Sequence, residues 1–182
     1  MDRSYPTRRP IDPDLGEGDG AADALPAELT TLPWVDAHNH AHTLSWNDRE
    51  KFALGGCHAM LTMAAGYYWT PYKPVRPEDV RYLWDDALNR IGAIRRSHAF
   101  DAKLAVGVHT GTPVEDVDEL FDAMPAYCEL DEVAAVGEIG INASQHVEPW
   151  SLEEQRYVNR RQLEIAADHD LPAVLHTPTA SG

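Results

Sequence analysis

The chain has 182 residues, and its 30 acidic and 15 basic side chains give a net charge of −15. This charge excludes a protein that coats nucleic acid with a generally basic surface. The 43% of apolar residues suffice to bury one core. No stretch approaches the roughly eighteen apolar residues of a membrane helix, so we expect a soluble, cytoplasmic protein. Lysine is scarce beside arginine, and this acidic balance is typical of proteins from salt-rich cytoplasm.

Two segments differ in composition. Residues 1–32 are rich in proline, glycine and aspartate and follow no apolar period, which predicts a flexible, acidic N-terminal extension. Residues 33–182 alternate short apolar runs with longer amphipathic stretches, a pattern that indicates a single α/β domain with parallel strands. The predicted strands are 33–37, 59–64, 104–108, 133–141 and 173–176.

Three helices are expected between these strands. Apolar residues from Val80 to Ile91 recur every three or four positions. Capping boxes at Thr112 and Ser151 precede two more stretches with apolar residues on one helical face, Val117-Leu120-Phe121-Met124 and Val158-Ile165-Ala166. Five strands are too few for a closed (β/α)₈ barrel of roughly 250 residues, so the length alone favours an open, doubly wound sheet.

The strongest local signal is a pair of histidines at the end of the first predicted strand. His38 and His40 are two residues apart, so their side chains share one face of a strand. They lie at the C-terminal end, where parallel α/β enzymes place their sites. The alternative is a histidine-rich surface turn. His42 shares the spacing, but we expect it to be a solvated loop residue beyond the strand.

Three more strand ends carry polar residues of the same kind. Glu138 lies in an apolar run, where a carboxylate is costly to bury unless it is bound to a metal or, alternatively, paired with an arginine. His109 and His176 each end a further run. Imidazole and carboxylate groups gathered at one edge favour zinc or a similar divalent ion. Because both cysteines, Cys57 and Cys128, stand alone, any metal must use nitrogen and oxygen ligands.

Over residues 33–180, the order and spacing of these motifs resemble the TatD family of metal-dependent hydrolases, within the amidohydrolase superfamily. The resemblance rests on four motifs: His38-Asn39-His40, Gly107-Val108-His109, Gly137-Glu138-Ile139-Gly140, and Leu171-Pro172 through His176. A glutamate in a Gly-Glu-Ile-Gly setting is the specifically TatD-like feature. The resemblance implies an α/β fold of the (β/α)₈ TIM-barrel type, of which only the first five or so βα units are present.

The resemblance also implies roles for the site residues. His38 and His40 would bind one metal, Glu138 would bridge two, and His176 would bind the second, so one or two divalent ions (zinc, magnesium or manganese) are expected. His109 would lie near the substrate, either a DNA end or a small-molecule phosphoester. The family's acid–base aspartate follows the eighth strand, so we expect it beyond Gly182. A product truncated there would also leave open sheet edges through which it can self-associate.

Two positions differ from the family pattern. Pro178 stands where an arginine is usual, and Asn142 stands where an aspartate is usual. Together with the negative charge, they weaken the case for a phosphodiester and leave an amide or lactone hydrolase as an alternative. A non-catalytic metal-binding module is another. The aromatic residues 67–69 and Tyr72 can stack on bases, but we interpret them as cover for the barrel mouth or helix layer.

Overall fold

The computed structural model describes residues 32–64, 74–97, 100–112, 114–142 and 150–176. The strands are β1 (Trp34–Asn39), β2 (Cys57–Met63), β3 (Asp101–Val106), β4 (Val133–Gly140) and β5 (Ala173–His176). The helices are η1 (Ala41–Thr43), α2 (Trp46–Leu54), α3 (Pro77–Ser97), α4 (Asp118–Cys128) and α5 (Leu152–Asp168). None of the helices in these ranges is long and apolar enough to cross a membrane. The predictions for residues 1–31, 67–72 and Pro178 fall outside the described residues.

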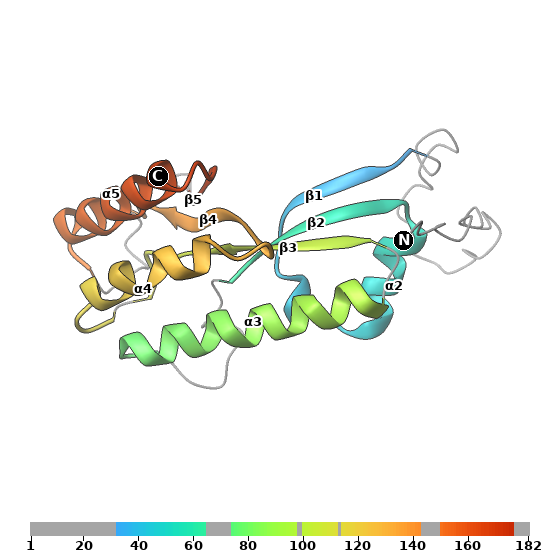
Figure 1. Cartoon of the computed structure of the whole chain (residues 1–182), viewed down its shortest axis with the longest axis horizontal. Coiled ribbons are helices and arrows are strands. Elements are labelled where there is room, and N and C mark those ends of the chain that lie inside the picture. The colour runs from blue at the N-terminus through green and yellow to red at the C-terminus, as the bar shows by residue number, and fades with distance from the viewer. Residues whose placement is uncertain (1–31, 65–73, 98–99, 113, 143–149, 177–182) are drawn as a thin grey trace, which may run out of the picture.

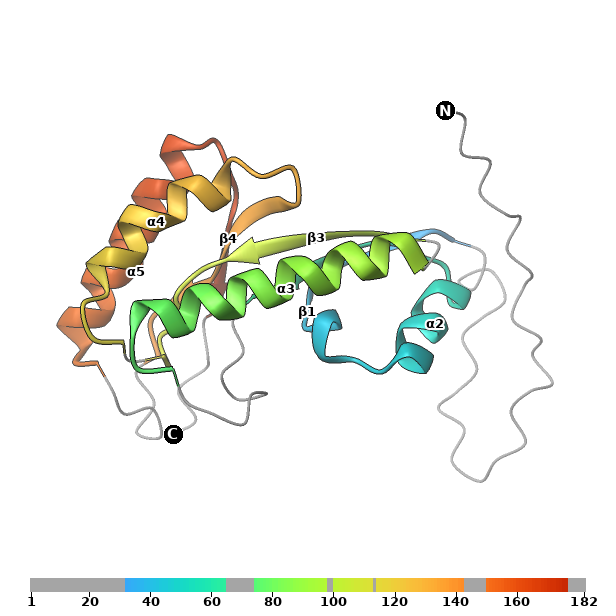
Figure 2. The ribbon, with the colours of Figure 1, turned by 60° about the horizontal axis from the view of Figure 1, so that its bottom comes forward.

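The strands form one sheet in the order of the sequence, and each is parallel to the next. A doubly wound sheet reverses its strand order at a switch point, whereas a barrel keeps it sequential. The five strands curl into an open half-barrel, with α3 running alongside β3 (Figures 1 and 2). This arrangement confirms the barrel fold and rules out the doubly wound sheet that the length alone favoured.

The sheet buries apolar residues on both faces. The main core lies between the strands and the helices, and includes Leu104 and Val106 of β3 with Trp84 and Ile91 of α3. On the opposite face a smaller cluster joins Met63, Ala105 and Ala135, with Leu61 and Val174 packed against it. Because both faces are covered, the strand sequences are nearly continuous apolar runs rather than alternating ones.

Two of the three predicted helices form as expected. In α3, the residues Val80, Trp84, Ala87 and Ile91 are buried. At the start of α5, the Ser151 hydroxyl accepts from the Glu154 amide, and the Glu154 carboxylate accepts from the Ser151 amide. This capping box is the one that the sequence predicts. The apolar stripe that follows is also buried, at Val158, Ile165 and Ala166.

The predicted start of the helix between β3 and β4 is wrong. This helix, α4, begins at Asp118, and its N-cap residue Val117 makes no side-chain capping bond. The Thr112 amide instead donates to the His109 carbonyl, and Asp116 has a positive φ of 50°, so the segment before α4 is a loop. The helix still buries the predicted residues Leu120, Phe121 and Met124. His109 lies outside β3, which ends at Val106, and leads into this loop.

The sequence analysis missed η1 and α2, which lie between β1 and β2. Helix α2 contains no buried residue, so it lacks the apolar stripe on which helix prediction depends. The available signal was Ser45, whose hydroxyl accepts from the Asp48 amide and caps the helix. In this connection, η1 follows His40 and packs against β2 and α3.

Candidate metal centre

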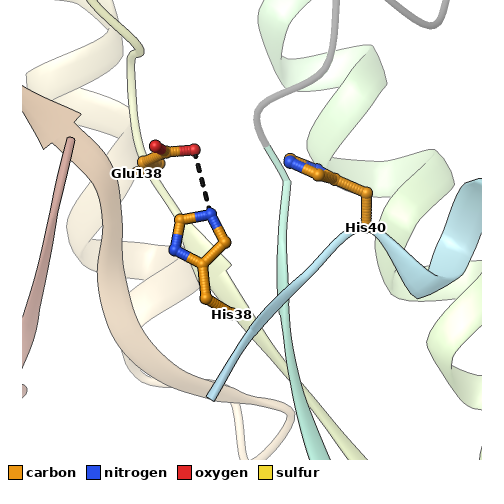
Figure 3. A group of neighbouring side chains, drawn as sticks. All are labelled: His38, His40 and Glu138. Atoms are coloured by element: carbon orange, nitrogen blue, oxygen red, sulfur yellow. Dashed lines mark ion pairs between the residues drawn. The ribbon is translucent and has the colours of Figure 1, made fainter. Parts of the chain in front are cut away.

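The predicted site residues come together at the C-terminal end of the sheet. β1 extends two residues further than predicted, so His38 lies within the strand and His40 lies directly after it. Glu138 lies in β4 and His176 is the last residue of β5. Figure 3 shows the His38 ring directed at the Glu138 carboxylate, with His40 approaching from the end of the same strand. This clustering argues against the histidine-rich surface turn.

The Glu138 carboxylate lies between two imidazoles. Its Oε2 is 3.3 Å from Nε2 of His38, and its Oε1 is 2.5 Å from Nδ1 of His176. Glu138 is only 7% exposed, and within the described ranges histidines, not an arginine or lysine, pair with it. The arginine-paired alternative is therefore not what these residues show. Each carboxylate oxygen faces a different histidine, as a bridging ligand requires.

Two groups of three residues have the spacing to hold a metal ion. One contains His38, His40 and Glu138, and the other contains His109, Glu138 and His176. Within each group the potential ligand atoms lie within 4.8 Å of one another, and Glu138 belongs to both. A tetrahedral ion with ligand distances of about 2.1 Å sets its ligand atoms about 3.4 Å apart. The 3.3 Å separation between His38 and Glu138 fits this spacing.

The Nδ1 atom of His109 is occupied by a backbone amide rather than by the Glu138 carboxylate. The Gly111 amide donates to Nδ1 at 3.0 Å. Burial of the ring, together with the neighbouring His176, lowers the pKa of His109 to about 4, so the ring is neutral at pH 7. The single ring hydrogen must then sit on Nε2, which has no lone pair for a metal. In this arrangement His109 is a hydrogen-bond donor beside the metal ligands.

His42 is not the solvated loop residue that the sequence predicted. It lies in η1 and is partly buried, and its ring centroid is 6.2 Å from that of His40. Burial, and next the proximity of His40, lower the pKa of His42 to about 4. It belongs to neither potential ligand group in the described part of the chain. Its ring therefore packs behind the site as a neutral group.

Asn39 is a structural contributor that the sequence analysis missed. Its Oδ1 accepts from the Thr62 hydroxyl at 3.0 Å and from the Ala41 amide at 2.9 Å. These bonds tie the end of β1 to β2 and fix the turn from which His40 projects. Side chains alternate along a strand, so the residue between His38 and His40 points away from them. That alternation is the signal from which a supporting role for Asn39 could have been inferred.

Two glycines beside Glu138 allow β5 to approach β4 closely. A Cβ atom on Gly137 would lie 2.7 Å from the Cβ of Val174. A Cβ atom on Gly140, which has a φ of +148°, would lie 2.3 Å from the carbonyl oxygen of His176. These glycines admit the neighbouring strand, and this brings His176 within reach of Glu138.

A sequential parallel sheet with histidines and a shared carboxylate at its C-terminal end defines the class of metal-site TIM barrels. The family model for TatD related DNases matches residues 35–182. The chain therefore belongs to the TatD family. The match covers all of the predicted site residues and every strand, except for Trp34 at the start of β1.

Individual relatives agree with this assignment. A metal-dependent hydrolase of Methanocaldococcus jannaschii, described as uncharacterized, is 31% identical over 144 residues, which make up 79% of this chain and 53% of that protein. The crystal structure of a TatD-like protein from Archaeoglobus fulgidus matches with a TM-score of 0.60 and 24% identity, covering 81% of this chain and 57% of that one.

A TatD family hydrolase from Entamoeba histolytica matches with a TM-score of 0.56 and 16% identity, over 81% of this chain and 50% of that protein. At such identities the solved structures establish the fold. The chain spans about half the length of the relatives that it matches.

Proposed function

We propose that this chain provides the first part of a metal-dependent hydrolase site that acts on a phosphoester, either a DNA end or a small molecule. The observation that carries the proposal is the position of Glu138, whose two oxygens face His38 and His176 and which is common to both potential ligand groups. A shared carboxylate of this kind suits two-metal hydrolysis. The match to TatD related DNases supports a phosphoester over other substrates.

The donor set fits one or two divalent ions. We assign His38 and His40 with Glu138 to one ion and His176 with Glu138 to a second, with zinc, magnesium or manganese as the candidates. When bound, such an ion lowers the pKa of a coordinated water, to about 7 in the case of zinc, and so supplies a nucleophile. The burial of Glu138 also favours an ion, because a buried carboxylate is costly without a positive partner.

We assign His109 to the substrate side of this site. The Gly111 amide contacts Nδ1 of His109, and the ring lies 4.5 Å from that of His176, measured between centroids. A neutral donor fixed beside the ligands can hydrogen-bond an oxygen of the substrate that gains negative charge during hydrolysis.

The test is hydrolysis by the full chain supplied separately with Zn²⁺, Mn²⁺ or Mg²⁺. The substrates are bis(4-nitrophenyl) phosphate, a short DNA duplex with free ends, an anilide and a lactone, and Glu138→Gln serves as the inactive reference. We expect metal-dependent turnover of one of the two phosphoesters, lost in Glu138→Gln. Turnover of the anilide or lactone alone would replace the phosphoester with the amidohydrolase alternative. Metal binding without any turnover would favour the non-catalytic module.

A separate proposal concerns the sheet edges. β1 and β5 form the two ends of the strand order, and Val35 and Leu175 on them are 61% and 52% exposed. Unpaired edges of this kind can pair with another copy, so we propose that the chain self-associates. Light scattering is expected to show a dimer or larger species that Val35→Lys reduces, because a charge on the edge disfavours pairing. A monomer at all concentrations would contradict this proposal.

A further inference from the structure

The residues that lead from β3 to His109 are held by helix side chains. The strand ends at Val106, and Gly107 and Val108 continue beyond it. The Trp84 indole Nε1 of α3 donates to the Gly107 carbonyl at 3.2 Å. Gln162 of α5 accepts from the Val108 amide at 2.6 Å and donates to the Val108 carbonyl at 3.1 Å. Gln162 therefore binds both backbone groups of Val108, as a neighbouring strand would.

The Gln162 amide has only one orientation that satisfies these contacts. It is fully buried, and its Nε2 also donates to the Val158 carbonyl at 3.3 Å. Rotating the amide by half a turn would bring donor against donor and acceptor against acceptor at Val108. A buried polar group that loses its partner is costly, and this cost holds the side chain in place. The backbone position of Val108 is thus determined by α5.

The backbone position of Val108 directly affects that of the next residue, His109. His109 follows Val108, and its ring is bound at Nδ1 by the Gly111 amide. The ring lies edge-on to that of His176, and one of its nitrogens lies within 4.8 Å of the ligand atoms of Glu138 and His176. A shift of the Val108 backbone would move this ring relative to the metal ligands. Placement errors of about 1 Å can cost about a hundredfold in rate.

A second glutamine on the same helix provides an internal comparison. Gln155 precedes Gln162 by two helical turns, and both side chains are buried. Gln155 accepts from the Asn142 amide at 2.9 Å and donates to the Trp150 carbonyl at 3.0 Å. It therefore holds the residues after β4 in the way that Gln162 holds those after β3. Its contacts do not include the backbone that carries His109.

We propose that Gln162, assisted by Trp84, is a positioning residue that places the His109 ring beside the metal ligands. The inference rests on the proposed function insofar as it concerns turnover, but the placement of the ring is a property of the folded chain alone. The two can therefore be tested separately, by a spectroscopic readout of His109 and by kinetics.

The first test follows the ring nitrogens of His109 by ¹⁵N NMR in the full chain supplied with Zn²⁺. The variants are Gln162→Met, which keeps the size of the side chain and removes its bonds to Val108, and Gln155→Met as the matched control. We expect a single tautomer with hydrogen on Nε2 in the unmodified chain and in Gln155→Met. In Gln162→Met we expect shifted and broadened His109 signals. Unchanged His109 signals in a folded Gln162→Met chain would overturn the proposal.

The second test is a double-mutant cycle on kcat. We expect Gln162→Met to lower kcat by about tenfold or more when His109 is present, and by less than about twofold when His109→Ala is already in place. Bound zinc per chain should stay the same in both backgrounds. An equal loss with and without His109 would mean that Gln162 acts only on the stability of the fold, and would overturn the proposal.

Two further outcomes keep the test decisive. If Gln162→Met does not fold, Trp84→Phe takes its place, because it removes the neighbouring bond to Gly107. We then expect Trp84→Phe to shift the His109 signals, and unchanged His109 signals in that variant would overturn the proposal. If the unmodified chain hydrolyses no phosphoester, the proposed function fails. The His109 signals of Gln162→Met then still decide the positioning role.

Discussion

β1 and β4 both bring candidate metal ligands to the same end of the sheet, but they do so from opposite environments. β1 is an edge strand with every residue at least partly exposed, and the His38 side chain is 44% exposed. β4 is a central strand that is buried almost throughout, and the Glu138 side chain is 10% exposed. The end of β1 supplies two candidate imidazole ligands, His38 and His40, while β4 supplies one candidate carboxylate ligand from the interior.

The difference shows how the two halves of the site contribute, namely the edge half on β1 and the central half on β4. The exposed His38 imidazole loses little hydration when it binds an ion, whereas His40 is partly buried and lies on a turn that Asn39 supports. A buried carboxylate is fixed by its packing and gains most from a positive partner, because it has already lost its water. We therefore expect changes near β4 to disturb the fold itself, and changes near β1 to disturb mainly metal binding.

The largest expected effect is on the central half, from Gly140→Ala. The new Cβ atom would collide with the carbonyl of His176 and would sit on a backbone with positive φ. We expect a loss of about 3 kcal/mol in the free energy of unfolding, measured with urea. Gly92→Ala in α3 is the control: only the flexible Arg96 end lies nearby, and a helical alanine is favoured by up to about 1 kcal/mol. Similar stability in the two variants would contradict the close approach of β5.

The next effect concerns the edge half. Replacing His38 and His40 together by alanine is expected to weaken zinc binding by more than about a hundredfold, because two ligands are lost. The free energy of unfolding of the metal-free chain should change by less than about 1 kcal/mol, because the His38 side chain is exposed and His40 is only partly buried. Calorimetric titration with Zn²⁺ and urea unfolding measure the two quantities. A large loss in the free energy of unfolding of the metal-free double variant would contradict the expected difference between β1 and β4.

A smaller effect is expected from the support of the edge half. Asn39→Ala removes the acceptor for Thr62 and Ala41, and we expect about tenfold weaker zinc binding because the turn that carries His40 is released. Asn39→Asp keeps an acceptor oxygen and should bind zinc more tightly than Asn39→Ala. Equal affinities in these two variants would show that the bonds to Asn39 do not orient the ligands.

The last effect is a pH dependence of stability, which is small within any one pH unit. His42 has a pKa of about 4 in the folded chain, lowered by burial from the ordinary 6.5. Between these values the unfolded chain binds more protons, so stability falls as the pH drops from 6.5 towards 4. The contribution is at most about tenfold in the unfolding equilibrium constant per pH unit. In the metal-free chain, His42→Leu should show a shallower decline over this window than the unmodified protein. An unaltered slope would mean that His42 is not buried as a neutral ring.

Much of this arrangement follows from local patterns. The strands were predictable because buried parallel strands form continuous apolar runs, and the site residues because they occupy the ends of those runs. The barrel order came from the family resemblance, since periodicity carries no information about which strands are neighbours. Helix α2 escaped prediction because it buries nothing, and the start of α4 was misplaced because Thr112 bonds back to His109 rather than capping a helix.

The supports of the site were harder to foresee. Gln162 acts on Val108 across 54 residues of sequence, and no local spacing encodes such a contact. The burial of His42 likewise depends on how η1 packs, and η1 was itself not predicted. Long-range polar contacts are set by tertiary packing, so a single sequence identifies the ligands of the site more readily than the residues that hold them.

The central claim is that Glu138 is the ligand common to both halves of the site. The most direct test is metal content per chain, by elemental analysis after purification at high salt, in Glu138→Gln and His42→Ala beside the unmodified chain. The account predicts that Glu138→Gln loses most of its metal, because a neutral amide cannot bridge the ligand groups, while His42→Ala retains it. Equal metal content in the two variants would contradict the assignment of Glu138.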